Sequence, residues 1–161
     1  MKSMVRVLFV CHGNICRSPM AEAVFKDMIA RRGLADQFEV GSAAVSSEEL
    51  GNPVYPSANH EMMRRGLPRS DHRAWQVSRA DYERYDYFVC MDRDNVYRLQ
   101  RIFGGDSKRK IGMLLAYTDD PREVEDPWYT GRFDKVYDDI VEGCEALLGE
   151  LLADGLKTNR E

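Results

Sequence analysis

Residues 5–10 constrain the fold more than any other segment of the chain. Arg6 is their one polar residue, and such a continuous apolar run predicts a strand buried on both faces of a parallel sheet. A short polar loop, residues 11–17, follows the strand. Ser18 then suits a helix N-cap and Pro19 the first helical position. Strand, tight loop and helix in this order predict the first half of a βαβ unit.

The rest of the chain alternates between the same two patterns. Apolar runs predict strands at 38–40, 87–91 and 111–115, and helices are predicted at 18–32, 57–65, from 79, 92–102 and 133–152. Residues 119–131 hold two prolines and many acids, and are expected to be loop. We therefore expect an α/β fold: a three-layer, doubly wound sandwich with a central parallel sheet of about four strands and helices on both faces. Residues 1–161 are expected to form one domain, frayed over 157–161.

Charge and composition disfavour several classes of protein. The net charge is −4 and no Lys/Arg run is longer than residues 108–110, which argues against nucleic acid or an anionic membrane as a partner. The chain has no apolar stretch of about 20 residues, the length of a membrane span, and no secretory signal pattern, so we expect a cytoplasmic protein. Its cysteines and histidines stand at no metal-ligand spacing, and neither a metal nor a cofactor is expected.

Cys11 is followed six positions later by Arg17. In so Arg-rich a chain this spacing is weak by itself, and a core cysteine that ends a strand is the alternative reading. The context strengthens it, because Gly13 lies in the loop, a helix follows, and ligands of open α/β sheets bind at the carboxyl ends of the strands. The sequence thus places a candidate ligand site at the end of the first strand.

A loop of this kind suits a phosphate group. Its backbone N–H groups can point at one anion, and the helix N-terminus adds the positive end of its dipole. Arg17 can hold two phosphate oxygens with its guanidinium group. The same donors favour a thiolate at Cys11, which makes this side chain a candidate nucleophile.

A phosphate ester that is attacked by a thiolate also needs an acid to protonate its leaving group. Asp126 is the best candidate, because Pro127 stiffens its loop and Trp128 and Tyr129 offer aromatic walls for a phenyl ring. An acidic surface turn is an equally good reading of this segment. The competing acids are Asp92, Asp119 and Asp120.

Residues 7–23, with Cys11 and Arg17 among them, resemble the signature loop of the low-molecular-weight protein tyrosine phosphatases. Further matches follow in the family's order at 42–44, 51–53, 72–74, 91–92 and 126–129, so the resemblance covers essentially the whole chain. It implies a metal-independent reaction on phosphotyrosine proteins. Cys11 would form a phosphocysteine, and Asp126 would protonate the leaving group and then help water to hydrolyse the intermediate.

The resemblance also implies roles for the residues around the nucleophile. The phosphate-binding set would be His12, Gly13, Asn14, Ile15, Cys16, Arg17 and Ser18, and inorganic phosphate or a similar oxyanion could occupy it. Ser18 would hydrogen-bond the thiolate, while Asn14, Ser42 and His72 would support the loop. Cys16 would form a reversible disulfide with Cys11, although a small packing residue is an equally good reading. Trp128 and Tyr129 would line the substrate pocket.

Two related activities are alternatives. Protein-arginine phosphatases of this fold resemble the chain but carry Thr where it has Ile15. Thioredoxin-coupled arsenate reductases need two further, closely spaced cysteines, whereas Cys90 and Cys144 are far apart and are expected in the core.

The chain also departs from the family pattern. Trp75 stands where many relatives have Arg, and Glu48 and Glu49 stand where relatives often place an aromatic residue. We expect these two acids to disfavour strongly acidic phosphopeptides.

Overall fold

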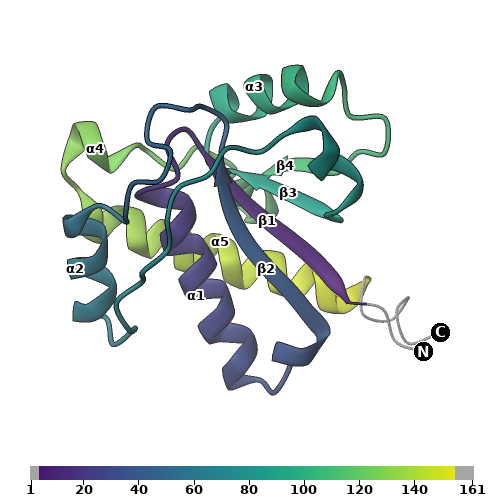
Figure 1. Cartoon of the computed structure of the whole chain (residues 1–161). Helices are drawn as coiled ribbons and strands as arrows, with labels where there is room; N and C mark the ends of the chain where they lie inside the picture. The colour runs from purple at the N-terminus through teal and green to yellow at the C-terminus, as the bar shows by residue number, and fades with distance from the viewer. Residues whose placement is uncertain (1–3, 155–161) are drawn as a thin grey trace.

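The fold is built on one parallel sheet. A computed structural model describes residues 4–154, so the fraying expected at 157–161 lies outside the described residues. The strands are β1 (Val5–Cys11), β2 (Phe38–Ala44), β3 (Tyr87–Cys90) and β4 (Ile111–Met113), in the order β2-β1-β3-β4 (Figure 1). The helices are α1 (Arg17–Arg31), α2 (Pro56–Arg64), α3 (Arg93–Phe103), α4 (Pro127–Thr130) and α5 (Phe133–Ala153), with 3-10 turns η1 (Ala35–Gln37), η2 (Arg79–Glu83) and η3 (Leu114–Tyr117).

Strand β1 is the centre of the sheet, as its sequence predicts. It pairs in parallel with β2 along its whole length and with β3 over Val7 to Val10. Alternate side chains enter opposite cores: Val7 and Phe9 pack on one face, and Leu8 and Val10 on the other. All four are fully buried. The apolar run therefore reflects burial on both faces of the sheet.

Helices cover both faces. Helices α1, α2 and α5 lie on one face of the sheet and α3 on the other (Figure 1). Side chains of α1, α2 and α5 contribute to one core, and side chains of α3 and η2 to the other. The expected three-layer α/β sandwich with a four-stranded parallel sheet is confirmed. Its carboxyl edge collects the ends of β1, β2 and β3, and residues from all three ends meet in the site described below.

Several expected boundaries were wrong. Helix α1 begins at Arg17, before the expected first helical residue Pro19, and Ser18 is not its N-cap. Strand β2 continues past residue 40 to Ala44, because it follows β1 to its end. The strand expected at 111–115 ends at Met113, and η3 begins at Leu114. The expected loop 119–131 contains the helix α4.

Helix α5 passes very close to the turn η3. A Cβ added at Gly143 would lie 2.4 Å from Cγ of Leu114, which is closer than any real side-chain contact. Leu114 is fully buried, so it has little room to move away. Gly143 thus lets α5 lie directly against the segment that follows β4. Over residues 4–154, no helix is both long and apolar enough to cross a membrane.

Candidate active site

Cys11 is the last residue of β1, and its thiol is held from two sides. Cys11 Sγ accepts a hydrogen bond from the Asn14 backbone N–H at 3.2 Å and lies 3.0 Å from Ser18 Oγ. Ser18 is fully buried, so its hydroxyl is committed to this loop rather than to capping α1. Within the described residues no side chain caps the start of α1. The first N–H groups of this helix are left available to an anion.

Asn14 is the hub of the loop. Its backbone has a left-handed φ of 62°, which asparagine tolerates better than most residues, and its side chain is fully buried. Nδ2 donates to Ser18 Oγ at 2.8 Å and to Ser42 Oγ at 3.1 Å. Oδ1 lies 2.7 Å from His72 Nε2 and accepts from the Trp75 N–H at 3.3 Å. The expected supporting group of Asn14, Ser42 and His72 is thus brought together.

Glu22 extends this group, and the sequence reading missed it. Its Oε1 accepts a hydrogen bond from Ser42 Oγ at 2.7 Å and lies 3.8 Å from His72 Nδ1. Burial lowers the pKa of His72, and the carboxylate of Glu22 opposes that shift. Its position one helical turn after Ser18, on the same face of α1, was the available signal. Glu22 therefore belongs to a chain of contacts that begins at Cys11, and it pairs in turn with Lys26 at 2.6 Å.

Arg17 is buried and joins three segments of the site. Its Nη1 donates to Asp92 Oδ2 at 2.8 Å and to the Val124 carbonyl at 2.9 Å, and its Nη2 lies 3.6 Å from Asp126 Oδ2. Burial opposes its charge, but the neighbouring Cys11 and the two carboxylates raise the pKa of Arg17 overall. A charged guanidinium group therefore lies beside the nucleophile.

The candidate acids differ in position. Asp92 binds Arg17 and also caps α3, because it accepts from the Asn95 N–H at 2.8 Å. Asp126 lines the same pocket as Cys11, and it caps α4 by accepting from the Trp128 N–H at 3.0 Å. Asp119 and Asp120 do not line that pocket. Of the four acids, Asp126 alone lines the pocket across from the thiol.

The segment that carries Asp126 is fastened at both ends. The buried Val124 N–H donates to the Met91 carbonyl at 2.8 Å. Glu125 accepts two hydrogen bonds from Arg132, at 2.6 and 2.9 Å. These bonds to Arg132 lower the pKa of Glu125 to about 2. The ion pair between Glu125 and Arg132 thus joins the two ends of the turn that bears Asp126.

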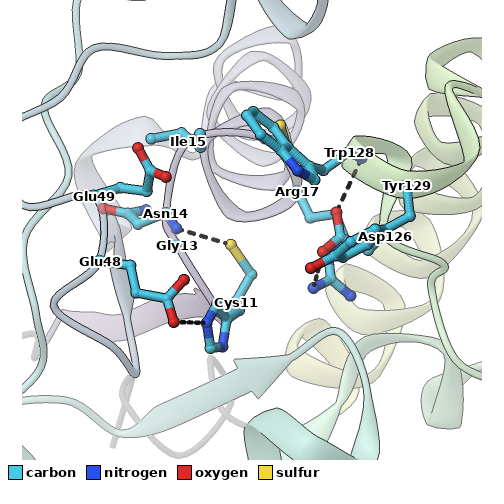
Figure 2. A pocket seen from close by; sticks show the side chains of 12 residues that line it. Cys11, Gly13, Asn14, Ile15, Arg17, Glu48, Glu49, Asp126, Trp128 and Tyr129 are labelled. Atoms are coloured by element: carbon cyan, nitrogen blue, oxygen red, sulfur yellow. Dashed lines mark hydrogen bonds and ion pairs between the residues drawn. The ribbon is translucent and has the colours of Figure 1, made fainter.

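The pocket above Cys11 has a volume of about 180 Å³. Figure 2 shows Glu48 and Glu49 on one side of it and Asp126 and Tyr129 on the other. Trp128 and Tyr129 line the pocket and are exposed by 51% and 83%. Glu48 Oε2 lies 3.1 Å from Nε2 of His12 in the loop. One wall is therefore aromatic and the opposite wall acidic.

The remaining cysteines are all buried. Cys16 lines the pocket, and its pKa is raised by burial and by the neighbouring Cys11. Cys90 and Cys144 are fully buried in the cores on opposite faces of the sheet, as expected of packing residues. Burial raises the pKa of both thiols. Trp75 is half-buried and packs against the core that contains α3.

Known proteins match nearly the whole chain. The profile of a family described as "Low molecular weight phosphotyrosine protein phosphatase" matches residues 6–158. Low molecular weight protein-tyrosine-phosphatase YfkJ of Bacillus subtilis is 40% identical over 92% of this chain and 96% of its own length. The low molecular weight phosphotyrosine protein phosphatase of Homo sapiens is 41% identical over 88% of this chain and 92% of its own.

Solved structures agree with these sequence matches. The crystal structure of YfkJ superposes with a TM-score of 0.90, covering 94% of this chain and 97% of that one. A structure described as a Drosophila arginine phosphatase, 32% identical, superposes with a TM-score of 0.82 over 96% and 99% of the two chains. Together with the geometry around Cys11, these matches establish that the chain belongs to the low molecular weight phosphotyrosine protein phosphatase family.

Proposed function

We propose that the chain hydrolyses phosphotyrosine in proteins through a phosphocysteine intermediate. The observation that carries this proposal is the placement of Cys11 Sγ among the Asn14 N–H, the Ser18 hydroxyl and Arg17, with Asp126 on the wall of the same pocket. Nucleophile, anion donors and acid thus share one cavity. The free cysteines suit a reducing compartment, and we place the activity in the cytoplasm.

In the first step the Cys11 thiolate attacks phosphorus. An S–P bond forms while the bond from phosphorus to the phenolic oxygen breaks, and Asp126 gives its proton to the departing oxygen. The loop N–H groups and Arg17 bind the non-bridging oxygens as charge shifts in the transition state. Arg17 is positioned for this because Asp92 and the Val124 carbonyl hold its other side.

In the second step water attacks the phosphocysteine. An O–P bond forms, the S–P bond breaks, and the carboxylate of Asp126 accepts the proton that the water loses. The hydrogen bond from Ser18 and the Asn14 N–H stabilise the thiolate as it leaves. Inorganic phosphate is then released and Cys11 is ready for another substrate.

The walls of the pocket favour an aryl phosphate. The cavity of about 180 Å³ is lined by Ile15, Trp128 and Tyr129, whose apolar surface suits a flat ring. Phosphoarginine is the second candidate substrate, since one structural relative is described as an arginine phosphatase. Ile15 favours phosphotyrosine, because its side chain offers no hydroxyl to a guanidinium group. An arsenate reductase relay is disfavoured because Cys90 and Cys144 lie in separate cores.

The test is hydrolysis of p-nitrophenyl phosphate, a phosphotyrosine peptide and a phosphoarginine peptide by the unaltered protein and by Cys11→Ser. We expect hydrolysis of the first two to be abolished in Cys11→Ser and to persist in Cys144→Ala, which removes a buried thiol that does not line the pocket. Rapid quenching of the wild-type reaction should trap one phosphate on Cys11. Continued turnover by Cys11→Ser would contradict the proposal, and faster hydrolysis of phosphoarginine would reassign the substrate.

A further inference from the structure

A second groove adjoins the catalytic pocket. Its volume is about 530 Å³, and it shares Ile15, Glu49 and Trp128 with the smaller pocket above Cys11. It lies between the start of α2 and the helix α4, which are neighbours at one end of the molecule (Figure 1). A ligand that fills the catalytic pocket can therefore continue directly into this groove.

The floor of the groove is tied to the catalytic loop. The Tyr55 N–H donates to the Ile15 carbonyl at 2.8 Å. The ring of Tyr55 lies 4.9 Å from that of Trp128 and stacks on Phe133 at 6.0 Å, centroid to centroid. The groove is thus formed in advance and fixed in position relative to Cys11, as a binding subsite requires.

Exposed apolar side chains line the groove. Met63 is 53% exposed and Trp128 is 51% exposed, although side chains of their size are more often buried. Both line the groove, and Tyr55 lies half-buried among its lining residues. Clustered apolar surface of this kind beside a catalytic pocket is typical of an interaction site.

A cation that is free for a ligand also lines the groove. Arg69 is exposed, and it makes no ion pair with any residue in the described part of the chain. The backbone of the next residue, Ser70, is held in place, because Asn59 Nδ2 donates to its carbonyl at 3.0 Å and Asn59 Oδ1 accepts from its N–H at 2.8 Å. The guanidinium group of Arg69 is therefore available to a ligand, and the chain segment next to it is fixed.

We propose that this groove binds the polypeptide on one side of the phosphotyrosine, with an apolar side chain against Trp128 and Met63 and an acidic one at Arg69. The inference rests on the proposed function and specifies its substrate class. The groove is continuous with the catalytic pocket, and this identifies its ligand. When a phosphotyrosine side chain fills the pocket, the polypeptide on one side of it must lie along a neighbouring surface. The unpaired Arg69 favours an acidic side chain at its own place in the groove, whereas Glu49, which lines both pockets, disfavours one next to the phosphotyrosine.

The test compares matched phosphotyrosine peptides that carry Leu or Ser, and Glu or Lys, at positions scanned within four residues on either side of the phosphotyrosine. Each kcat/KM is divided by that for p-nitrophenyl phosphate, which has no flanking residues and reports on the catalytic pocket. We expect the best Leu/Glu peptide to exceed its Lys counterpart by about threefold, the size of an exposed ion pair. Arg69→Glu should reverse that preference, and Met63→Ser should weaken the preference for Leu.

Arg32→Glu is the matched control. Arg32 is exposed, makes no ion pair among the described residues, and follows α1 at the end opposite the catalytic loop. This variant makes the same change in net charge and should keep the wild-type preference. Equal rates on all peptides, with p-nitrophenyl phosphate still hydrolysed, would overturn the groove and leave the proposed function standing. Failure on every substrate would overturn both.

Discussion

The catalytic loop (residues 11–18) and the acid segment (residues 119–132) supply the two halves of the same site but are held in different ways. Asn14 and Ser18 are fully buried and joined by neutral hydrogen bonds, and the buried Arg17 is paired with Asp92. The acid segment has one buried anchor, the Val124 backbone, but the turn around Asp126 depends on an ion pair nearer to solvent, between Glu125 and Arg132, whose side chain is 59% exposed. Buried contacts thus hold the nucleophile in a rigid setting, whereas contacts nearer to solvent hold the acid and leave it more freedom to move.

The catalytic loop and the acid segment should therefore respond differently to substitution and to salt. Buried hydrogen bonds are strengthened by their low-dielectric surroundings and are costly to leave unpaired. Exposed ion pairs are worth little and are screened by salt. Changes in the catalytic loop should therefore affect both stability and turnover. Changes at the supports of the acid segment should alter proton transfer mildly and in a salt-dependent way.

Asp126→Asn gives the largest expected effect. It keeps the cap of α4 but cannot donate a proton, so kcat should fall by about 10²–10⁴-fold. The loss should be greater for phenyl phosphate than for p-nitrophenyl phosphate, whose leaving group needs less protonation. Steady-state kinetics with both esters measures this. An unchanged kcat would show that the acid segment contributes no acid, and Asp92 would become the candidate.

Asn14→Ala tests the buried hydrogen bonds of the catalytic loop. It removes the partner of Ser18, Ser42 and His72, and it places Ala, which tolerates left-handed backbone less well than Asn, at a φ of 62°, so unfolding should require about 2–3 kcal/mol less. Turnover should fall with it. Asn14→Gly restores the backbone preference without the hydrogen bonds and separates the two causes. If denaturant unfolding found Asn14→Ala as stable as the wild type, the buried hydrogen bonds would not be what distinguishes the catalytic loop from the acid segment.

Glu125→Gln tests the ion pair of the acid segment. With the ion pair to Arg132 weakened, Asp126 should be placed less well, and kcat for phenyl phosphate should fall by about threefold. High salt should have the same effect on the wild type and little effect on the variant. Exchanging the charges, with Glu125→Arg and Arg132→Glu together, should restore part of the loss. If kcat depended on salt in the same way in the variant and in the wild type, this explanation would be contradicted.

Glu48 gives the catalytic loop an exposed contact of its own, with His12. Changing both Glu48 and Glu49 to Gln should raise kcat/KM for phosphopeptides with acidic residues next to the phosphotyrosine by about two- to threefold. The rate on p-nitrophenyl phosphate serves as the reference. Wild-type rates that do not depend on acidic neighbours would count against this role.

The smallest expected effect concerns acid stability. The folded pKa of Glu125, about 2, lies below its ordinary value of 4.5, so its stabilising contribution is present above pH 4.5 and is lost as the pH falls towards 2. Solvent screening at this exposed pair should keep the effect below about 1 kcal/mol. Glu125→Gln should therefore show a shallower fall in stability over this range in acid unfolding followed by circular dichroism.

The sequence predicts the sheet and its faces well, because burial on both sides leaves a continuous apolar pattern in β1. It predicts Cys11 and Arg17 by their position after that strand. The family resemblance gave the contact of Ser18 with Cys11, but the local pattern misplaced Ser18 as an N-cap, because a hydroxyl before Pro19 has that pattern. In the structure that hydroxyl is buried against Cys11 and Asn14 instead. Local preference was overruled by tertiary contacts.

Other features depend on contacts between distant segments, which no local pattern records. Asp92 was weighed as an acid, yet its partner Arg17 is 75 positions away. Glu22 has the pattern of a first-turn helix residue, and its role depends on Ser42 and His72. The helix α4 was missed because it is only four residues long. Tyr55 contacts Ile15 and Trp128, which line both pockets, but it belongs to no sequence motif that would have marked it.

The close approach of α5 to η3 has a consequence for how the family can diverge. A side chain at position 143 and the full Leu at position 114 exclude each other at the present spacing. Relatives that carry a larger residue at 143 should therefore carry a smaller one at 114, or a helix α5 displaced from the sheet. These two positions, 29 residues apart, are expected to covary across an alignment.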